Sequence, residues 1–97
     1  MIVRIVRMTF QEDKIDEFLG VFEEVQDRIR NFEGCSHLEL CRDSKEANIL
    51  CTLSHWESET HLDSYRESAL FLSTWAKTKV FFAASPIAFS LSKVEDF

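Results

Sequence analysis

Residues 54–75 read SHWESETHLDSYRESALFLSTW, and this stretch decides how the rest of the chain is arranged. It holds both tryptophans of the chain, its only tyrosine and two of its three histidines. An apolar, strand-like run leads into it, and its second half has helical spacing. We therefore expect it to join a strand to a helical segment and to supply much of any functional site.

Two short helices are predicted inside and just beyond this stretch. Ser58 is a candidate N-cap for a helix over Glu59–Glu67. Ser68 is a candidate N-cap for a second helix that begins at Ala69 and runs to Val80. Serine suits both places, because its hydroxyl accepts a hydrogen bond from a backbone N–H of the first helical turn.

The strand that leads into the stretch belongs to a predicted hairpin. Cys35–Arg42 and Asn48–Trp56 both read as strands, and the short polar segment 43–47 joins them. Opposed residues in an antiparallel pair have a constant sum of residue numbers. A sum of 92 is one arithmetically simple register for this pair.

That register would place His37 opposite His55 and Cys41 opposite Cys51 on one face of the hairpin. Such a set resembles a metal-ligand cluster. The chain lacks the C-x₂-C spacing of structural zinc sites, and a slip of one residue would disperse the set. We therefore favour the alternative, in which small thiols pack beside polar strand residues, and we expect no metal.

The remaining segments complete a four-stranded pattern. Ile2–Phe10 reads as a strand, and Gln11–Phe32 has the single apolar stripe of a helix that stops near Gly34. Pro86 begins a last strand, in which apolar and small residues alternate. The order βαββαβ predicts the α+β class, with a ferredoxin-like, four-stranded antiparallel sheet and helices on one face.

A chain of 97 residues is expected to form a single domain over residues 1–97. Its helices would cover one face of the sheet, while apolar residues remain on the other. A second copy of the chain could cover that face. We therefore expect a homodimer whose two sheets pack face to face.

The net charge of −6 and the scattered basic residues argue against nucleic acid as a partner. The acidic surface disfavours an anionic membrane, and no apolar run approaches the roughly 20 residues of a membrane-spanning helix. The first ten residues, MIVRIVRMTF, lack the apolar core of a secretory signal. With three cysteines, an odd number, the simplest expectation is a cytoplasmic protein with free thiols.

The residues described so far resemble a known family. The carriers of the resemblance are Trp56-Glu57-Ser58, Leu62, Tyr65-Arg66-x-Ser68, Phe71 and Trp75, with Glu33-Gly34-Cys35 before the second strand and Ala88-Phe89-Ser90-Leu91 in the last. Together they are similar to the antibiotic biosynthesis monooxygenase family of dimeric α/β barrel proteins. The resemblance implies a monooxygenase that oxidises an aromatic or quinol-like molecule with O₂ and no cofactor.

The resemblance also suggests which side chains do the work. A flat aromatic substrate needs apolar walls, for which Trp56, Phe71, Trp75 and Phe81 are the candidates, and polar groups that handle a proton and an anion. The catalytic candidates are His55 as a base, Tyr65 as a hydrogen-bond donor and Arg66 as a charge that steadies an enolate or phenolate. His37 is a further polar group that could contact the substrate.

Each of these residues also has an ordinary structural role. Aromatic side chains at helical spacing usually form core, a strand histidine is usually structural or exposed, and Arg66 could simply pair with a nearby acid. Two rival functions follow from these alternatives. One is a dimer that binds a small aromatic molecule without turning it over, and the other is an isomerase or decarboxylase on the same scaffold.

The chain also departs from the family at several positions. Many members carry a glutamate where this chain has Ser54, and histidines at Tyr65 and near Leu70. If those groups handle protons in relatives, this chain uses different groups or different chemistry. The haem-degrading branch has ligand and pocket residues at positions that correspond to Val6, Tyr65 and Trp75 here, and none matches, which argues against haem.

Overall fold

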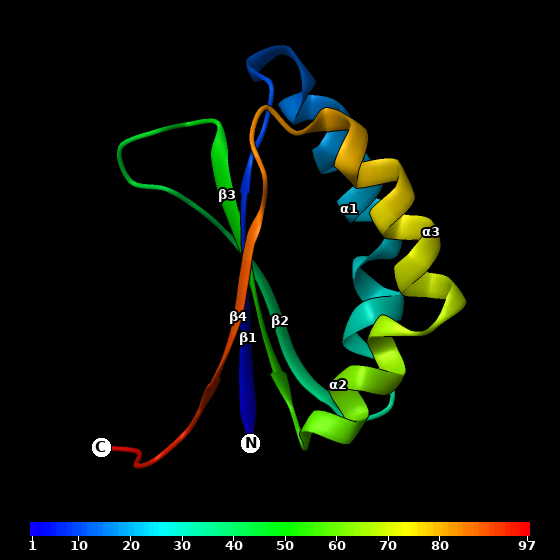
Figure 1. Ribbon diagram of the computed structural model, residues 1–97, viewed down its shortest axis with the longest axis vertical. Helices are drawn as coiled ribbons and strands as arrows, with labels where there is room; N and C mark the ends of the chain where they lie inside the picture. The colour runs from blue at the N-terminus through cyan, green and yellow to red at the C-terminus, as the bar shows by residue number, and fades with distance from the viewer.

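The structure is a computed structural model that describes residues 1–97. Figure 1 shows a single sheet seen edge-on with all of the helices on one side of it. The elements in chain order are β1 (Ile2–Thr9), α1 (Ile15–Arg30), β2 (Cys35–Arg42), β3 (Ile49–Trp56), α2 (Glu59–Arg66), α3 (Ala69–Thr78) and β4 (Ile87–Ser92), with 3₁₀ turns at Glu12–Lys14 and Lys79–Phe81.

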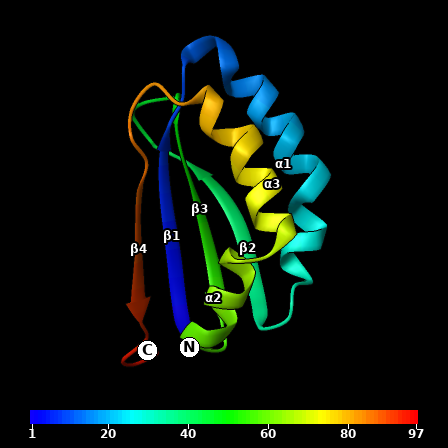
Figure 2. The same cartoon turned by 45° about the vertical axis from the view of Figure 1, so that its right-hand side comes forward.

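The four strands form one antiparallel sheet in the order β2-β3-β1-β4. Figure 2 shows this order across the sheet, with α1, α3 and α2 lying over one face and both termini at the same end. The predicted ferredoxin-like fold is therefore confirmed. None of the helices has the length and hydrophobicity that crossing a lipid bilayer requires.

The predicted helix over Gln11–Phe32 is shorter in the structure, and its first residues form a 3₁₀ turn. The backbone N–H of Gln11 donates to the Phe81 carbonyl at 2.9 Å, and its side-chain amide donates to the Val80 carbonyl at 3.2 Å. These bonds hold Gln11 against the end of the helical layer, so regular α1 begins only at Ile15. Four apolar side chains of α1, at Phe18, Phe22, Val25 and Ile29, are buried against the sheet.

The hairpin of β2 and β3 has the predicted register. His37 lies opposite His55 and Cys41 opposite Cys51, and the register shifts only between Cys35 and His37. No group of three or more histidine, cysteine or acidic side chains in the chain is placed to hold a metal ion. The three thiols are free.

The registers give the sheet a simple rule. Even-numbered strand residues pair with even-numbered ones across β1, β3 and β4, as Arg4 does with Ser54 and with Ser90. The even-numbered set faces the helices and includes the buried Met8 and Trp56. The odd-numbered set faces away from the helices.

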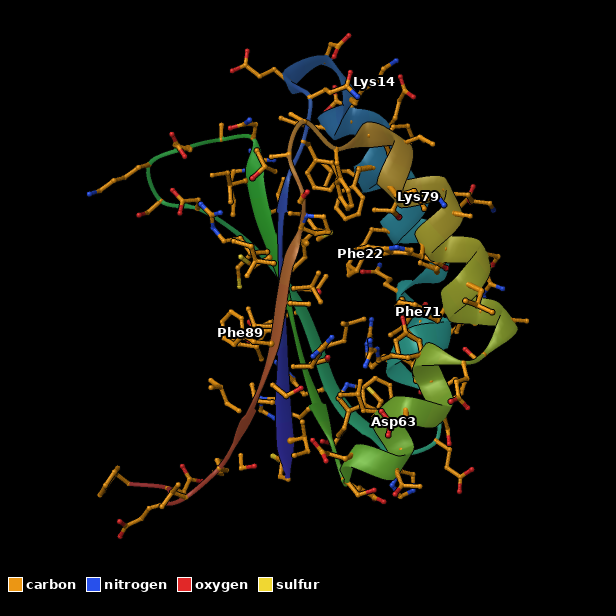
Figure 3. All side chains as sticks on the ribbon, viewed as in Figure 1. Lys14, Phe22, Asp63, Phe71, Lys79 and Phe89 are labelled. Carbon is orange, nitrogen blue, oxygen red and sulfur yellow. The ribbon has the colours of Figure 1, made fainter.

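We call that second surface the open face. In Figure 3, Phe89 points away from the helices, whereas Phe22 and Phe71 lie between the helices and the sheet. On β4, Ile87, Phe89 and Leu91 are 53%, 41% and 50% exposed, which is high for large apolar side chains in regular structure. The open face therefore presents uncovered apolar surface.

Candidate functional site

The candidate site is a cavity of about 310 Å³ between the helical layer and the sheet. That volume is at the small end of the range for small-molecule sites. Most of its lining is hydrophobic: Val6, Met8, Phe18, Phe22, Ile29, Leu38, Leu62, Phe71, Trp75, Pro86 and Ala88 line it, with Tyr65. Arg4, Thr52, Ser54, Arg66, Thr74 and Thr78 supply the polar part of the lining.

Four aromatic side chains contact one another in series beside the cavity, and we call them the aromatic chain: Trp56, Tyr65, Phe71 and Trp75. Tyr65 stacks on Trp56 with ring centroids 4.9 Å apart, and Phe71 meets Tyr65 edge-on at 5.3 Å. Phe71 in turn stacks on Trp75 at 5.9 Å. Trp56 is fully buried behind Tyr65 and does not itself line the cavity. The arrangement suits a flat, apolar ligand.

Ser68 fixes the middle of this aromatic chain. Its hydroxyl accepts a hydrogen bond from the Phe71 backbone N–H at 3.1 Å, and it donates to the Tyr65 carbonyl at 2.6 Å. The same serine therefore caps α3 and ties it to the end of α2. This link between the two helices holds Tyr65 beside Phe71.

Five hydroxyl-bearing residues line the cavity, and Ser54, Tyr65 and Thr74 among them have free hydrogen-bonding capacity. Ser54 Oγ accepts a hydrogen bond from the Trp56 indole N–H at 2.9 Å, which leaves its own proton to donate. Thr74 Oγ1 is buried without a partner. Burial raises the pKa of the Tyr65 phenol far above its usual range, with a smaller contribution from Cys35, so Tyr65 is a hydrogen-bond donor and not a base near neutral pH.

Two arginines supply the positive charge of the cavity. Arg4 is half-buried, and its Nη1 donates to Ser90 Oγ at 3.1 Å. Burial lowers the pKa of Arg4 most, the positive charge of Arg66 lowers it further, and Asp63 acts in the opposite sense. Arg66 is exposed, so solvent reaches the cavity beside it. Neither arginine belongs to any of the ion pairs in the chain.

The predicted site residues are divided between the two faces of the sheet. Tyr65, Arg66, Phe71 and Trp75 line the cavity. Phe81 is half-buried against the adjoining core and does not line it.

His37 and His55 lie on the open face, on the other side of the sheet from the cavity. Their rings are 5.0 Å apart, and His37 Nε2 lies 3.3 Å from a Glu39 carboxylate oxygen. Partial burial, then His37 and Lys93, lower the pKa of His55, while Glu39 acts to raise it. Within one chain, therefore, neither imidazole reaches a ligand in the cavity.

Sequence reasoning missed Arg4, Ser54 and Thr74 as parts of the site. The signal for Arg4 was present in the alternation of β1, where it interrupts the inward-facing series Ile2, Val6, Met8. That interruption alone is equally consistent with a strand end that meets solvent. Only the fold places Arg66 of α2 close enough to act on Arg4.

The chain matches one family model, described as antibiotic biosynthesis monooxygenase, over residues 1–77. The match covers the sheet through β3 and all of α2, and it ends inside α3. No curated protein matches the chain in sequence.

Solved structures share the whole fold. A candidate antibiotic biosynthesis monooxygenase from Caulobacter crescentus CB15 is 24% identical with a TM-score of 0.90, and the match covers 97% of this chain and 90% of that one. A conserved protein from Methanosarcina mazei Go1 is 19% identical with a TM-score of 0.89, covering 96% and 93%. Rv0793 from Mycobacterium tuberculosis is 17% identical with a TM-score of 0.90, covering 98% and 100%. At these identities the likeness establishes the fold.

Proposed function

The chain belongs to the antibiotic biosynthesis monooxygenase family, and we propose that it oxidises a flat aromatic or quinol-like molecule with O₂ in the cavity between helices and sheet. The observation that carries the proposal is the aromatic chain of Trp56, Tyr65, Phe71 and Trp75 beside unpaired hydrogen-bond donors. This combination suits a substrate with a planar ring system and a ring oxygen.

The chemistry that we propose draws its electrons from the substrate. Loss of a proton from an anthrone-type ring CH₂ gives a delocalised anion, which can pass one electron to triplet O₂. The resulting radicals combine to form a C–O bond, and the hydroperoxide then loses water. The sum is R₂CH₂ and O₂ giving R₂C=O and H₂O, so one oxygen atom enters the product and the other leaves as water.

The protein would lower the barrier by stabilising the anion. The protonated phenol of Tyr65 can donate a hydrogen bond to the ring oxygen on which the charge develops. The nearby positive charge of Arg66 favours the same state. The cavity lining contains no carboxylate or imidazole, so we assign the departing proton to water that enters beside the exposed Arg66.

Oxygen uptake with anthrone as the probe tests this proposal. Tyr65→Phe removes the donor with little change in shape and is expected to slow uptake by more than tenfold. His55→Ala tests the sequence-based assignment of His55 as a base, and its place on the open face leads us to expect little change. If Tyr65→Phe leaves the rate unchanged, the proposed role of Tyr65 is wrong.

A non-catalytic binding protein is the second candidate. It is favoured by the absence of any carboxylate or imidazole from the cavity lining and by Ser54, where many relatives have glutamate. Such a protein would quench its tryptophan fluorescence with anthrone but consume no O₂. An isomerase would instead exchange the substrate C–H for deuterium without O₂.

We also propose that the protein works as a homodimer in the cytoplasm, with the open faces of two copies packed together. The uncovered Ile87, Phe89 and Leu91 supply the apolar surface that such packing buries. Native mass spectrometry should give twice the mass of the chain, and Phe89→Lys should shift it to the monomer. A wild-type monomer would contradict the proposal.

A further inference from the structure

We propose that Arg4 and Arg66 form a carboxylate-binding subsite of the cavity, so that its ligand is a flat apolar molecule that carries a carboxylate. The inference rests on the proposed function for the choice of cavity, and it adds the class of ligand. Arg66 would then act on the substrate chiefly by holding its carboxylate, which leaves Tyr65 for the ring oxygen.

Arg4 occupies an unusual position in the sheet. It faces the helices from β1, between the inward-facing Ile2 and Val6. Its cross-strand neighbours are the two small hydroxyl residues Ser54 on β3 and Ser90 on β4. A long cationic side chain in an inward-facing row is uncommon, and the serines on both sides leave room for a polar group beside it.

The positive charge of the two arginines is uncompensated by any ion pair. Two guanidinium groups act on each other across the cavity lining, and no carboxylate lies within ion-pair distance of either one. Asp63, labelled on α2 in Figure 3, attracts Arg4 weakly and does not line the cavity. A half-buried positive charge at Arg4 without a counter-ion, beside the like charge of Arg66, is unfavourable, and a bound anion would relieve it.

The shape of a guanidinium group also suits a carboxylate ligand. A guanidinium presents its N–H donors in a planar fork that matches the two oxygens of a carboxylate. The hydroxyls of Ser54 and Tyr65 lie on the same cavity lining and can add hydrogen bonds. The rest of the lining is aromatic and aliphatic, which requires the remainder of the ligand to be apolar.

The overall charge of the chain makes the inference easy to test. At a net charge of −6 the protein as a whole repels anions. A preference for a negatively charged ligand over its neutral analogue must therefore come from a local site.

The test compares 2-naphthoate with 2-naphthamide, which have nearly the same shape and differ in charge. Isothermal titration calorimetry on the full chain at low salt should give about tenfold tighter binding of the naphthoate, as one charge-assisted pair contributes. Arg4→Gln and Arg66→Gln should each abolish most of that preference and change naphthamide affinity by less than about twofold.

Arg7→Gln is the matched control, because Arg7 lies on the same strand but faces away from the cavity. It should leave the preference intact. Thermal unfolding separates a binding role from a structural one, since relief of the repulsion should leave Arg4→Gln at least as stable as wild type. A structural arginine would give a clear loss of stability instead.

The inference is overturned if the two naphthalene ligands bind equally, if neither binds, or if the arginine variants keep the preference. Oxygen uptake is a separate measurement. Binding selectivity without oxidation would leave the carboxylate subsite standing and refute the oxygenase, and oxidation of neutral anthrone without selectivity would do the reverse.

Discussion

Ser54 and Trp56 share a buried hydrogen bond that supports the aromatic side of the cavity. The indole N–H donates to Ser54 Oγ at 2.9 Å, and both residues are almost fully buried. A buried donor that loses its partner costs more than the bond contributes while it is formed. A single hydroxyl therefore keeps the largest side chain of the core in place.

Ser54→Ala should lower the free energy of unfolding by about 1–3 kcal/mol, because it leaves the Trp56 indole N–H unpaired. Urea denaturation measures the loss. Ser92→Ala on exposed β4 is the control and should change little. In the Trp56→Phe background, Ser54→Ala should cost clearly less, and an equal cost in both backgrounds would refute the pairing.

Replacing either of the two glycines of the chain by alanine should change the stability of the protein, but in opposite directions. Gly34 has φ of +90°, and a Cβ there would lie 2.4 Å from carbon atoms of His61. Gly20 lies in the middle of α1 with open space around it. Gly34→Ala should therefore lower the free energy of unfolding by more than about 1 kcal/mol, and Gly20→Ala should raise it by roughly 0.5–1 kcal/mol. Thermal unfolding of both variants checks the signs.

The junction of α2 and α3 links two aromatic residues that line the cavity. Ser68 links the backbone of Tyr65 to that of Phe71, so its loss should loosen the aromatic chain as well as the helix cap. Ser58 caps α2 in the same way, accepting from the His61 N–H at 3.2 Å, but it lies outside the cavity.

Ser68→Ala and Ser58→Ala should each cost about 1 kcal/mol of stability through the lost cap. Only Ser68→Ala should also weaken naphthoate binding, because only Ser68 positions cavity-lining rings. Thermal unfolding and calorimetry on the same two proteins provide the comparison. Equal effects on binding would show that the junction does not organise the site.

Periodicity was enough to predict the elements themselves. The serine caps at Ser58 and Ser68 and the stop at Gly34 follow from local spacing. The register that opposes His37 to His55 was one that counting allowed, and the structure has it. Which face of the hairpin meets the helices does not follow from spacing, because apolar residues occur on both faces of the strands. For that reason the sequence grouped His55 with Trp56, although neighbouring strand residues point to opposite sides of the sheet.

The break that Arg4 makes in the alternation of β1 could not by itself predict the role of this residue. Its role depends on Arg66, which is 62 positions away in the chain and approaches it only when α2 folds over the sheet. The aromatic cluster was predictable as a group, since Phe71 and Trp75 lie one helical turn apart. Its contact with Tyr65 depends on how α3 follows α2 at Ser68.

Across the whole molecule, the two faces of the sheet carry different features. Its helix-facing side lines the cavity, and its open face carries the exposed apolar residues of β4 together with His37 and His55. A titrating group on the open face can therefore act on stability and on the proposed packing of two copies, but it does not reach a ligand in the cavity of its own chain.

The stability of the protein should fall as the pH drops below about 6.5. Partial burial and the charges of His37 and Lys93 hold the pKa of folded His55 below that of the unfolded chain, against the weaker pull of Glu39. Between the two pKa values the unfolded state binds more protons, so stability is present above this window and is lost as the pH falls through it.

Urea midpoints at pH 7.5 and 5.5 measure this effect, with His55→Gln as the test variant. The variant should lose less stability than wild type between the two pH values. Ser92→Ala, which removes no titratable group, is the control and should follow wild type. If His55→Gln also follows wild type, His55 does not carry the pH dependence.

Even- and odd-numbered strand residues lie on opposite faces of the sheet, so mutations can change the two faces separately. Even-numbered strand residues such as Val6, Thr52 and Ala88 line the cavity, whereas odd-numbered ones such as Phe89 lie on the open face. Libraries restricted to one parity could therefore evolve specificity and assembly independently. A one-residue insertion in β1 would turn the strand residues beyond it to the opposite face of the sheet. Variation in this family should therefore favour replacement over insertion in that strand.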